Sequence, residues 1–157
     1  MIDCPVSGGP HDVSAGAITL LAGGAAEHVE RAAPVLKAYG DPILHVGPLG
    51  AGQAVKLVNN AVFAASIGLL AEAVRLGDQL GLDEANLLNA LPHGSAASRA
   101  LDSAARAGSV ACFAAAVEEF LSKDIAVVRA TAASLGADLG VLDDAIRAVR
   151  DASAAPD

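Results

Sequence analysis

A long apolar segment dominates the middle of the chain. Between Asp41 and Glu72 the only formally charged residue is Lys56. The spacing of the apolar residues predicts one helix from about Ala51 to Leu80, which is long for a globular domain at roughly 1.5 Å per residue. A helix with so little charge must be covered, by the rest of the chain or by another chain. We therefore expect an exposed apolar patch on this helix unless another chain covers it.

No membrane partner is expected. The most apolar part of the segment, Leu57 to Ala71, is interrupted by asparagine, serine and glycine, and it is shorter than the roughly 20 residues that a span needs. The N-terminus has neither the basic region nor the apolar run of a signal peptide. The two cysteines, Cys4 and Cys112, are far apart in sequence and form no metal-binding pair, which indicates a reducing compartment. These features favour a soluble, cytoplasmic protein.

Composition narrows the fold class and the partners. The chain has 157 residues, of which 54% are hydrophobic and only 3% aromatic. Much of the apolar fraction is alanine, which favours helices and close helix packing. The formal net charge is −8 and there is no basic run, which argues against nucleic acid or an anionic membrane as a partner. We expect a mostly helical, closely packed protein.

Two regions of different character are predicted. Up to residue 47, short apolar runs separated by glycine and proline indicate strands and one helix, whereas after Pro48 every expected element is helical. The expected strands are 2–6, 17–22 and 43–46, and the expected helices are 26–39, 51–80, 83–91, 95–106, 117–135 and 142–151, with 108–113 irregular. Three strands leave open sheet edges, so residues 1–47 are predicted to be an incomplete α/β region. Residues 48–157 are predicted to form a helical domain.

Lys56 is the first candidate for chemistry, together with Asn60 one helical turn later. An ammonium and an amide on one helix suit the binding and protonation of an oxygen atom of a small polar substrate. A lysine in an apolar setting can donate and accept a proton near neutral pH. The simpler interpretation is a lysine whose head reaches solvent at the helix edge, and an asparagine that bonds another helix.

Ser7-Gly8-Gly9, after the first predicted strand, is the second candidate. Consecutive glycines expose backbone N–H groups that can bind a carboxylate or phosphate, and the alternative is an ordinary tight turn. Gly47-Pro-Leu-Gly-Ala-Gly52 does not have the G-x-G-x-x-G spacing of a dinucleotide-binding turn. It is better explained as a tight helix start close to the sheet.

The remaining charged residues have simpler explanations. Lys123 lies four residues after Glu119, a favourable orientation for a solvated ion pair. Asp143 and Asp144 are predicted to lie on a solvated helix face. The four histidines form no spacing that indicates a metal site, so no metal is expected.

Four segments, taken in order, resemble the β-hydroxyacid dehydrogenase family, which includes 3-hydroxyisobutyrate dehydrogenase and tartronate semialdehyde reductase. The segments are Asp3-Cys-Pro-Val-Ser-Gly-Gly9, Gly16-Ala-Ile-Thr-Leu-Leu-Ala-Gly-Gly24, Gly50-Ala-Gly-Gln-Ala-Val-Lys-Leu-Val-Asn-Asn60 and Phe120-Leu-Ser-Lys-Asp-Ile125. The resemblance covers nearly the whole chain. It implies an all-helical domain like the C-terminal domain of 6-phosphogluconate dehydrogenase over 48–157, with 1–47 as the terminal strands of a truncated nucleotide-binding domain.

The resemblance also implies roles. Lys56 would be the catalytic general acid and base. Ser7, Gly8 and Gly9 would hold the carboxylate of a small β-hydroxyacid or aldehyde substrate, and Asn60 would hydrogen-bond the same substrate. Lys123 would contact the NAD or NADP cofactor, whose hydride transfer the protein would orient.

One departure from the family affects activity. A complete member begins with a nucleotide-binding domain carrying G-x-G-x-x-G, and that motif does not occur in these residues. We therefore expect most of the NAD(P) site to be absent, and expect the chain alone to be inactive or weak as an enzyme. The resemblance implies a homo-oligomer, dimeric or tetrameric, and the missing domain suggests a separate nucleotide-binding half as partner. The alternative is a catalytically dead helical oligomerisation module. The choice of hydroxyacid, and of NAD or NADP, would depend on the other domain.

Overall fold

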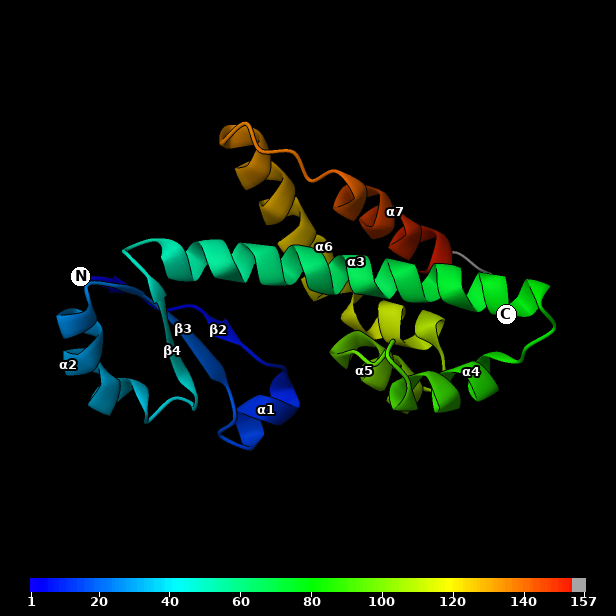
Figure 1. Ribbon diagram of the computed structural model, residues 1–157, viewed down its shortest axis with the longest axis horizontal. Coiled ribbons are helices and arrows are strands. Elements are labelled where there is room, and N and C mark those ends of the chain that lie inside the picture. The colour runs from blue at the N-terminus through cyan, green and yellow to red at the C-terminus, as the bar shows by residue number, and fades with distance from the viewer. Residues whose placement is uncertain (154–157) are drawn as a thin grey trace. The chain divides into compact units, whose positions relative to one another are not determined.

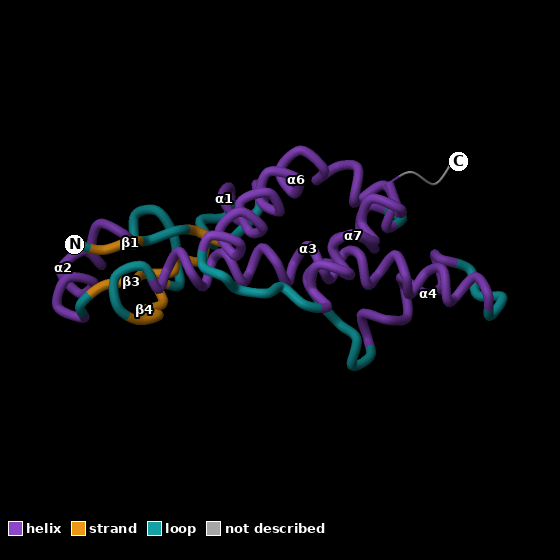
Figure 2. Tube along the Cα trace, turned by 90° about the horizontal axis from the view of Figure 1, so that it is seen from above, coloured by secondary structure: helices purple, strands orange, loops and turns teal. Residues whose placement is uncertain are grey.

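The computed structural model describes residues 1–153, with the side chains of all of them except 10, 11 and 150–153. The described chain is mainly helical, with a small four-stranded sheet near the N-terminus, as the sequence predicted. Figure 2 shows the orange strands gathered at the N-terminal end and helices along the rest of the trace. Contacts divide the chain into two compact units, Met1–Asn59 and Asn60–Asp157, so that the long helix α3 (Ala51–Gln79) belongs to both.

Strand β3 is the centre of the sheet in the first unit. The elements of this unit are β1 (Ile2–Asp3), β2 (Val6–Ser7), α1 (Pro10–Ser14), β3 (Thr19–Gly24), α2 (Ala26–Leu36) and β4 (Ile43–Gly47), followed by the start of α3. β1 and β2 pair antiparallel with β3, and β4 pairs parallel with it. Leu20 pairs with both Val6 and Ile43, and Gly23 pairs with both Asp3 and Gly47, so β1 and β2 share one side of β3 and β4 occupies the other. Figure 1 shows α2 beside these strands, and its Val29 is buried.

The sequence predicted these strands with two errors. The strand expected over 2–6 is interrupted at Cys4 and Pro5, because proline lacks the N–H that a ladder needs. Pro5 still accepts a 2.9 Å hydrogen bond from Leu21 through its carbonyl oxygen. The strand expected to stop before Gly23 instead continues through Gly24, because the two glycines pair with β1.

Helix α3 starts against the sheet, as its glycine-rich first turn predicted. Gly52 is buried, and a Cβ on it would lie less than 3.0 Å from the carbonyl oxygen of Leu21 in β3. No residue larger than glycine fits this approach without displacing a backbone. This contact fixes the start of the helix that carries Lys56.

The second unit is a helical core. Its elements are the rest of α3, α4 (Glu84–Ala90), the short 3-10 helix η1 (Leu91–His93), α5 (Arg99–Ala107), α6 (Val110–Ser134) and α7 (Val141–Ser153). The largest completely buried side chains are Ile67, Leu101 and Val128, one each from α3, α5 and α6. Asp83 caps α4 as predicted, and its Oδ1 accepts hydrogen bonds from Ala85 and Asn86. Five helices, α3 to α7, thus meet around apolar side chains rather than around a polar site.

Two predictions for the second unit were wrong. Residues 110–113, expected to be irregular, are the first turn of α6, because Ser109 caps it through a 3.0 Å hydrogen bond from Cys112 N–H. Asp143, expected on a solvated face, is half-buried and accepts a 2.7 Å hydrogen bond from Arg129 of α6. Arg147 also pairs with Asp143, so this carboxylate ties α7 to α6.

Helix α3 is long and apolar enough to cross a membrane when judged by length and composition alone. The sequence prediction considered only the most apolar part, Leu57 to Ala71, whereas the whole helix has 29 residues, close to its predicted bounds. The same test is passed by core helices of soluble proteins, and a third of its most apolar window, 33%, is buried in the structure. This single helix is weak evidence for a membrane.

Candidate active site

The Ser7-Gly8-Gly9 turn joins β2 to α1. Ser7 pairs with Thr19 of β3, and Gly8 has a φ of 152°, which an L-residue rarely adopts. The Gly9 N–H donates a 2.7 Å hydrogen bond to Oδ2 of Asp12. This N–H therefore already serves the start of α1, and a ligand carboxylate would have to share or replace that bond. Carboxylate binding at this turn stays a prediction.

Lys56 lies in the second turn of α3 and is half-buried. Among the described side chains of residues 1–59, none makes an ion pair or side-chain hydrogen bond with its ammonium. A partly desolvated ammonium without a local partner is costly, and it is free to bind an oxygen atom of a ligand. Its role as a proton donor and acceptor stays a prediction.

Asp3 anchors the start of α3, and the sequence reasoning did not identify it. Its Oδ1 accepts a 2.6 Å hydrogen bond from Gly50 N–H, and its Oδ2 accepts one of 2.8 Å from Gln53 N–H. The bond from Gly50, opposed by partial desolvation and supported by the bond from Gln53, holds the pKa of the Asp3 carboxyl below its ordinary value of 3.8. The available signal was the start of α3, which has no Ser, Thr, Asp or Asn of its own to cap it.

The other predicted site residues belong to the second unit. Asn60 is half-buried, one turn after Lys56 on α3. Lys123 is exposed on α6, and the ion pair expected between Glu119 and Lys123 is not present among the described residues. The ion-pair explanation of Lys123 was therefore wrong, and its ammonium faces solvent.

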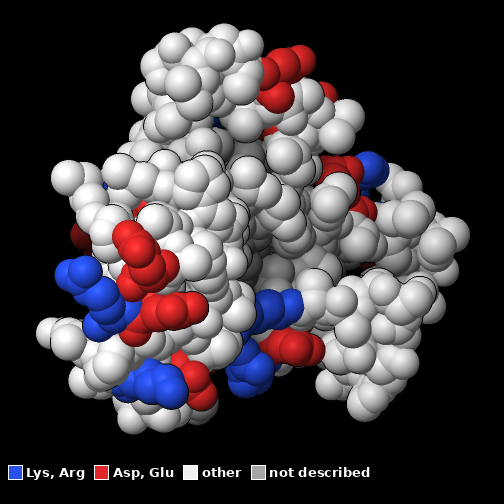
Figure 3. Space-filling model, turned by 60° about the vertical axis from the view of Figure 1, so that its left-hand side comes forward, with Lys and Arg blue, Asp and Glu red and all other residues white. Residues whose placement is uncertain are grey.

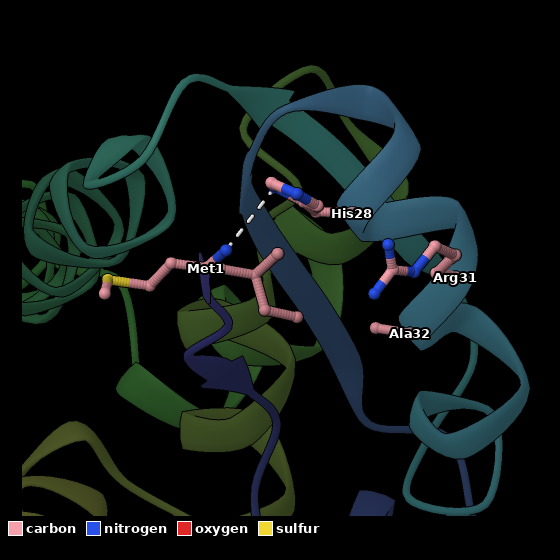
Figure 4. A pocket seen from close by; sticks show the side chains of 5 residues that line it. Met1, His28, Arg31 and Ala32 are labelled. Carbon is pink, nitrogen blue, oxygen red and sulfur yellow. Dashed lines mark hydrogen bonds between the residues drawn. The ribbon is translucent and has the colours of Figure 1, made fainter.

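An open hollow of about 260 Å³ lies in the first unit. Figure 4 shows it between the N-terminal residue and helix α2, where the Met1 amine lies 3.4 Å from Nδ1 of His28. It is lined by Met1, Ile2, His28, Arg31 and Ala32. None of the residues predicted for substrate or cofactor lines it. Within the described residues, no group of three or more His, Cys, Asp or Glu side chains is placed to hold a metal ion.

Comparison with known proteins decides the family. Residues 50–156 match the profile described as NAD-binding of NADP-dependent 3-hydroxyisobutyrate dehydrogenase, and residues 1–47 match the NAD binding domain of 6-phosphogluconate dehydrogenase. The chain belongs to the β-hydroxyacid dehydrogenase family. Its resemblance to that family in the ordered segments is thereby confirmed.

Individual relatives of this dehydrogenase family agree. The chain is 41% identical over 102 residues to the NAD-dependent L-serine dehydrogenase of Pseudomonas aeruginosa, and 40% identical over 102 residues to the 3-hydroxyisobutyrate dehydrogenase of that organism. Each match covers 65% of the chain and 34% of the relative. The solved 3-hydroxyisobutyrate dehydrogenase of Mycobacterium tuberculosis with L-serine has a TM-score of 0.75 at 26% identity, over 96% of this chain and 54% of that one. The matches thus span about a third of the length of these two relatives and about half of the solved structure.

NAD(P) is the cofactor of this β-hydroxyacid dehydrogenase family. Within the described residues, the donor set suits only part of such a cofactor. Lys123 offers an exposed ammonium, whereas the space beside Gly23 and Gly52 is occupied by the Asp3 carboxylate. A contact between Lys123 and the cofactor stays a prediction, and the space beside Gly23 and Gly52 is not open to a phosphate.

Proposed function

We propose that the chain is the C-terminal part of an NAD(P)-dependent oxidoreductase that interconverts a small β-hydroxyacid and its aldehyde or keto form. The observation that carries the proposal is Lys56. It is half-buried, has no local partner, and lies on a helix whose first turn is bonded to the segment that leads to Ser7. The family match supports the same role.

Each candidate residue has its own role in the proposed reaction. In reduction, the Lys56 ammonium gives a proton to the carbonyl oxygen while the carbonyl carbon gains a hydride; in oxidation, the neutral amine takes the hydroxyl proton back. Bound NAD(P)H supplies the hydride. The Ser7-Gly8-Gly9 turn holds the substrate carboxylate, Asn60 donates to a substrate oxygen, and Lys123 contacts the cofactor.

The chain alone is proposed to be a weak or inactive enzyme. Its donors toward the cofactor are few, and the profile matches assign residues 1–47 to part of a nucleotide-binding domain and residues 50–156 to the helical domain. We propose that a nucleotide-binding half in the same or another chain completes the site, and that the protein works in the cytoplasm. A division after residue 47 would then separate the remnant of that half from the helical domain.

Association is the second part of the proposal. Val62, Leu69 and Leu76 follow one another at seven-residue intervals on α3 and are 47%, 61% and 54% exposed. This spacing places them along one face of the helix, where a second chain can cover them. Figure 3 colours the charged side chains of one face of the molecule, where Lys and Arg lie beside Asp and Glu. The same row supports the alternative function, a catalytically dead oligomerisation module.

Activity separates these two functions. The chain is titrated with NADH to measure its affinity and is assayed with NAD⁺ for oxidation of 3-hydroxyisobutyrate, alone and with a nucleotide-binding half supplied from a related dehydrogenase. We expect no micromolar NADH affinity for the chain alone, and turnover only in the mixture. Lys56→Ala should lower that turnover roughly 100-fold or more, as removal of a general acid does. Lys37→Ala, which changes the other lysine of the first unit, should leave it intact.

Each result has a clear meaning. Micromolar affinity and turnover by the chain alone would contradict its proposed weakness. Turnover that survives Lys56→Ala would remove the role assigned to this lysine. A chain that associates normally but never supports turnover would favour the oligomerisation module.

A further inference from the structure

Asp3 joins two segments of the first unit that lie far apart in sequence. Its two carboxylate oxygens accept separate hydrogen bonds, of 2.6 Å from Gly50 and 2.8 Å from Gln53. Both donors belong to the start of α3, where the N–H groups have no partner inside the helix. A strand residue thus does what the side chain of an N-cap residue normally does.

The space around this carboxylate depends on two glycines. A Cβ on Gly52 would lie 2.6 Å from Oδ2 of Asp3 and 3.0 Å from Cδ of Pro5. A Cβ on Gly23 would collide with Oδ1 of Asp3 and lie 2.8 Å from the backbone nitrogen of Gly52. The first turn of α3 therefore meets the sheet, the carboxylate and Pro5 in close contact. A shift of this turn would break contacts on three sides.

The same contacts connect the two halves of the candidate site. Ser7 follows Asp3 by four residues, and Lys56 follows Gln53 by three residues on the helix. We propose that Asp3 is a positioning residue, which holds the first turn of α3 and thereby sets where Lys56 stands relative to the Ser7-Gly8-Gly9 turn. The role of Lys56 in this inference rests on the proposed function. The ionised carboxylate suits the position, since negative charge is favourable at a helix N-terminus.

The chain is well suited to a direct test because it has only three lysines, Lys37, Lys56 and Lys123. The complete chain is treated with limiting acetic anhydride, and the labelling rate of each lysine is read by peptide mass spectrometry. Lys37, in the same unit, is the internal reference. Because a change in global stability would affect both lysines, the ratio of the Lys56 rate to the Lys37 rate reports the setting of Lys56 itself.

Three variants weaken the interaction between Asp3 and the start of α3 to different extents. Asp3→Ala removes both acceptors, Asp3→Asn retains one oxygen, and Gln53→Pro removes one donor while keeping the charge, at a helix position where proline is tolerated. A helix end that loses its cap opens more often, so the labelling ratio should rise roughly threefold or more in Asp3→Ala. Asp3→Asn should restore part of the wild-type ratio, and Gln53→Pro should raise it. The matched control is Asp83→Ala, which uncaps α4 in the second unit and should not change the ratio.

Two results would overturn the inference. One is an unchanged ratio in Asp3→Ala and Gln53→Pro with native circular dichroism. The other is a ratio that responds to both Asp3 variants but not to Gln53→Pro, which would show an effect of charge rather than position. If Asp3→Ala does not fold, Asp3→Asn and Gln53→Pro decide.

A parallel measurement keeps the proposed function separate. The wild-type chain is labelled in the presence of excess 3-hydroxyisobutyrate as the probe. Protection of Lys56, but not of Lys37, supports its place beside the substrate. Absence of protection contradicts the substrate site, whereas the inference about Asp3 is judged only by the ratios without the probe.

Discussion

Replacement of Gly68 by alanine tests how α3 is held in the helical core. Gly68 is buried in the middle of α3, and a Cβ on it would lie 2.8 Å from the carbonyl carbon of Ala145 in α7 and closer still to its oxygen. The same atom would lie 3.4 Å from Cβ of Ala148. The obstacle is backbone, which cannot rotate away as a side chain can. Gly68→Ala therefore forces α3 and α7 apart.

Two opposing terms set the magnitude. Alanine is favoured over glycine inside a helix by about 1 kcal/mol. Overpacking of a well-packed core costs about 1–3 kcal/mol, and more when nothing nearby can yield. Because the contact is with backbone, we take the upper part of that range and expect the free energy of unfolding to fall by about 1–2 kcal/mol. For a chain of this size that corresponds to a fall in Tm of about 2–8 °C.

The matched control is Gly77→Ala in the same helix. A Cβ there would meet Cδ1 of Leu87, the end of a flexible side chain, and no backbone atom. Moving that side chain costs about 0.5–1.5 kcal/mol, which the gain in helix propensity nearly offsets. Urea and thermal unfolding, followed by circular dichroism, should place Gly77→Ala near the wild type and Gly68→Ala clearly below it. A Gly68→Ala protein as stable as Gly77→Ala would refute the close approach of α3 and α7.

Three further predictions concern charge, capping and association. The hydrogen bond from Arg129 holds the pKa of Asp143 below 3.8. A group whose pKa is lower in the folded state than in the unfolded state stabilises the protein above the unfolded pKa, and this stability is lost as pH falls through the folded pKa. The difference in urea midpoint between wild type and Asp143→Asn should therefore be constant at neutral pH and shrink below about pH 4. A difference that grows in acid would contradict the pairing. Glu84 accepts a 2.8 Å hydrogen bond from Val110 N–H at the start of α6. Glu84→Ala leaves that donor unpaired, so the free energy of unfolding, measured in urea, should fall by about 1–2 kcal/mol. An unchanged free energy would show that water replaces the carboxylate. Leu69→Glu should shift the protein toward the monomer in sedimentation velocity without lowering its Tm, and unchanged association would exclude the exposed row on α3 as the interface.

The order of the elements could be predicted because it depends on local sequence. The apolar spacing of α3, the Asp83 cap and the glycine-rich first turn each act within a few residues, and the structure confirms them. The errors arose where a distant partner changes the outcome. Gly23 and Gly24 end a strand by propensity, but pairing with β1 extends it. Asp143 was predicted to lie on a solvated face because nothing in its local sequence indicates its hydrogen bond with Arg129 of α6.

The candidate site shows the same division. Lys56 is recognisable from sequence because one charge in a long apolar segment needs a reason, and the ordered segments around it identify the family. Asp3 was part of a recognised segment, yet its partners are 47 and 50 residues away, and no local pattern connects it with them. The hydrogen bond from Gly9 N–H to Asp12 is local, but it depends on the short helix α1. This helix was not predicted from the sequence because glycine and proline surround its start.

The boundary within α3 has a consequence for how the site is built. Sequence profiles assign Lys56 to the helical region that begins at residue 50, whereas contacts assign it to the unit that ends at Asn59. The contacts have a physical origin, because Asp3 and the approach of Gly52 to Leu21 tie the first turns of α3 to the sheet. The proposed proton donor therefore shares a unit with the Ser7-Gly8-Gly9 turn that would hold the carboxylate, while Asn60 and Lys123 belong to the other. Substitutions in residues 1–5 should consequently alter the behaviour of Lys56, even though the two segments match different profiles.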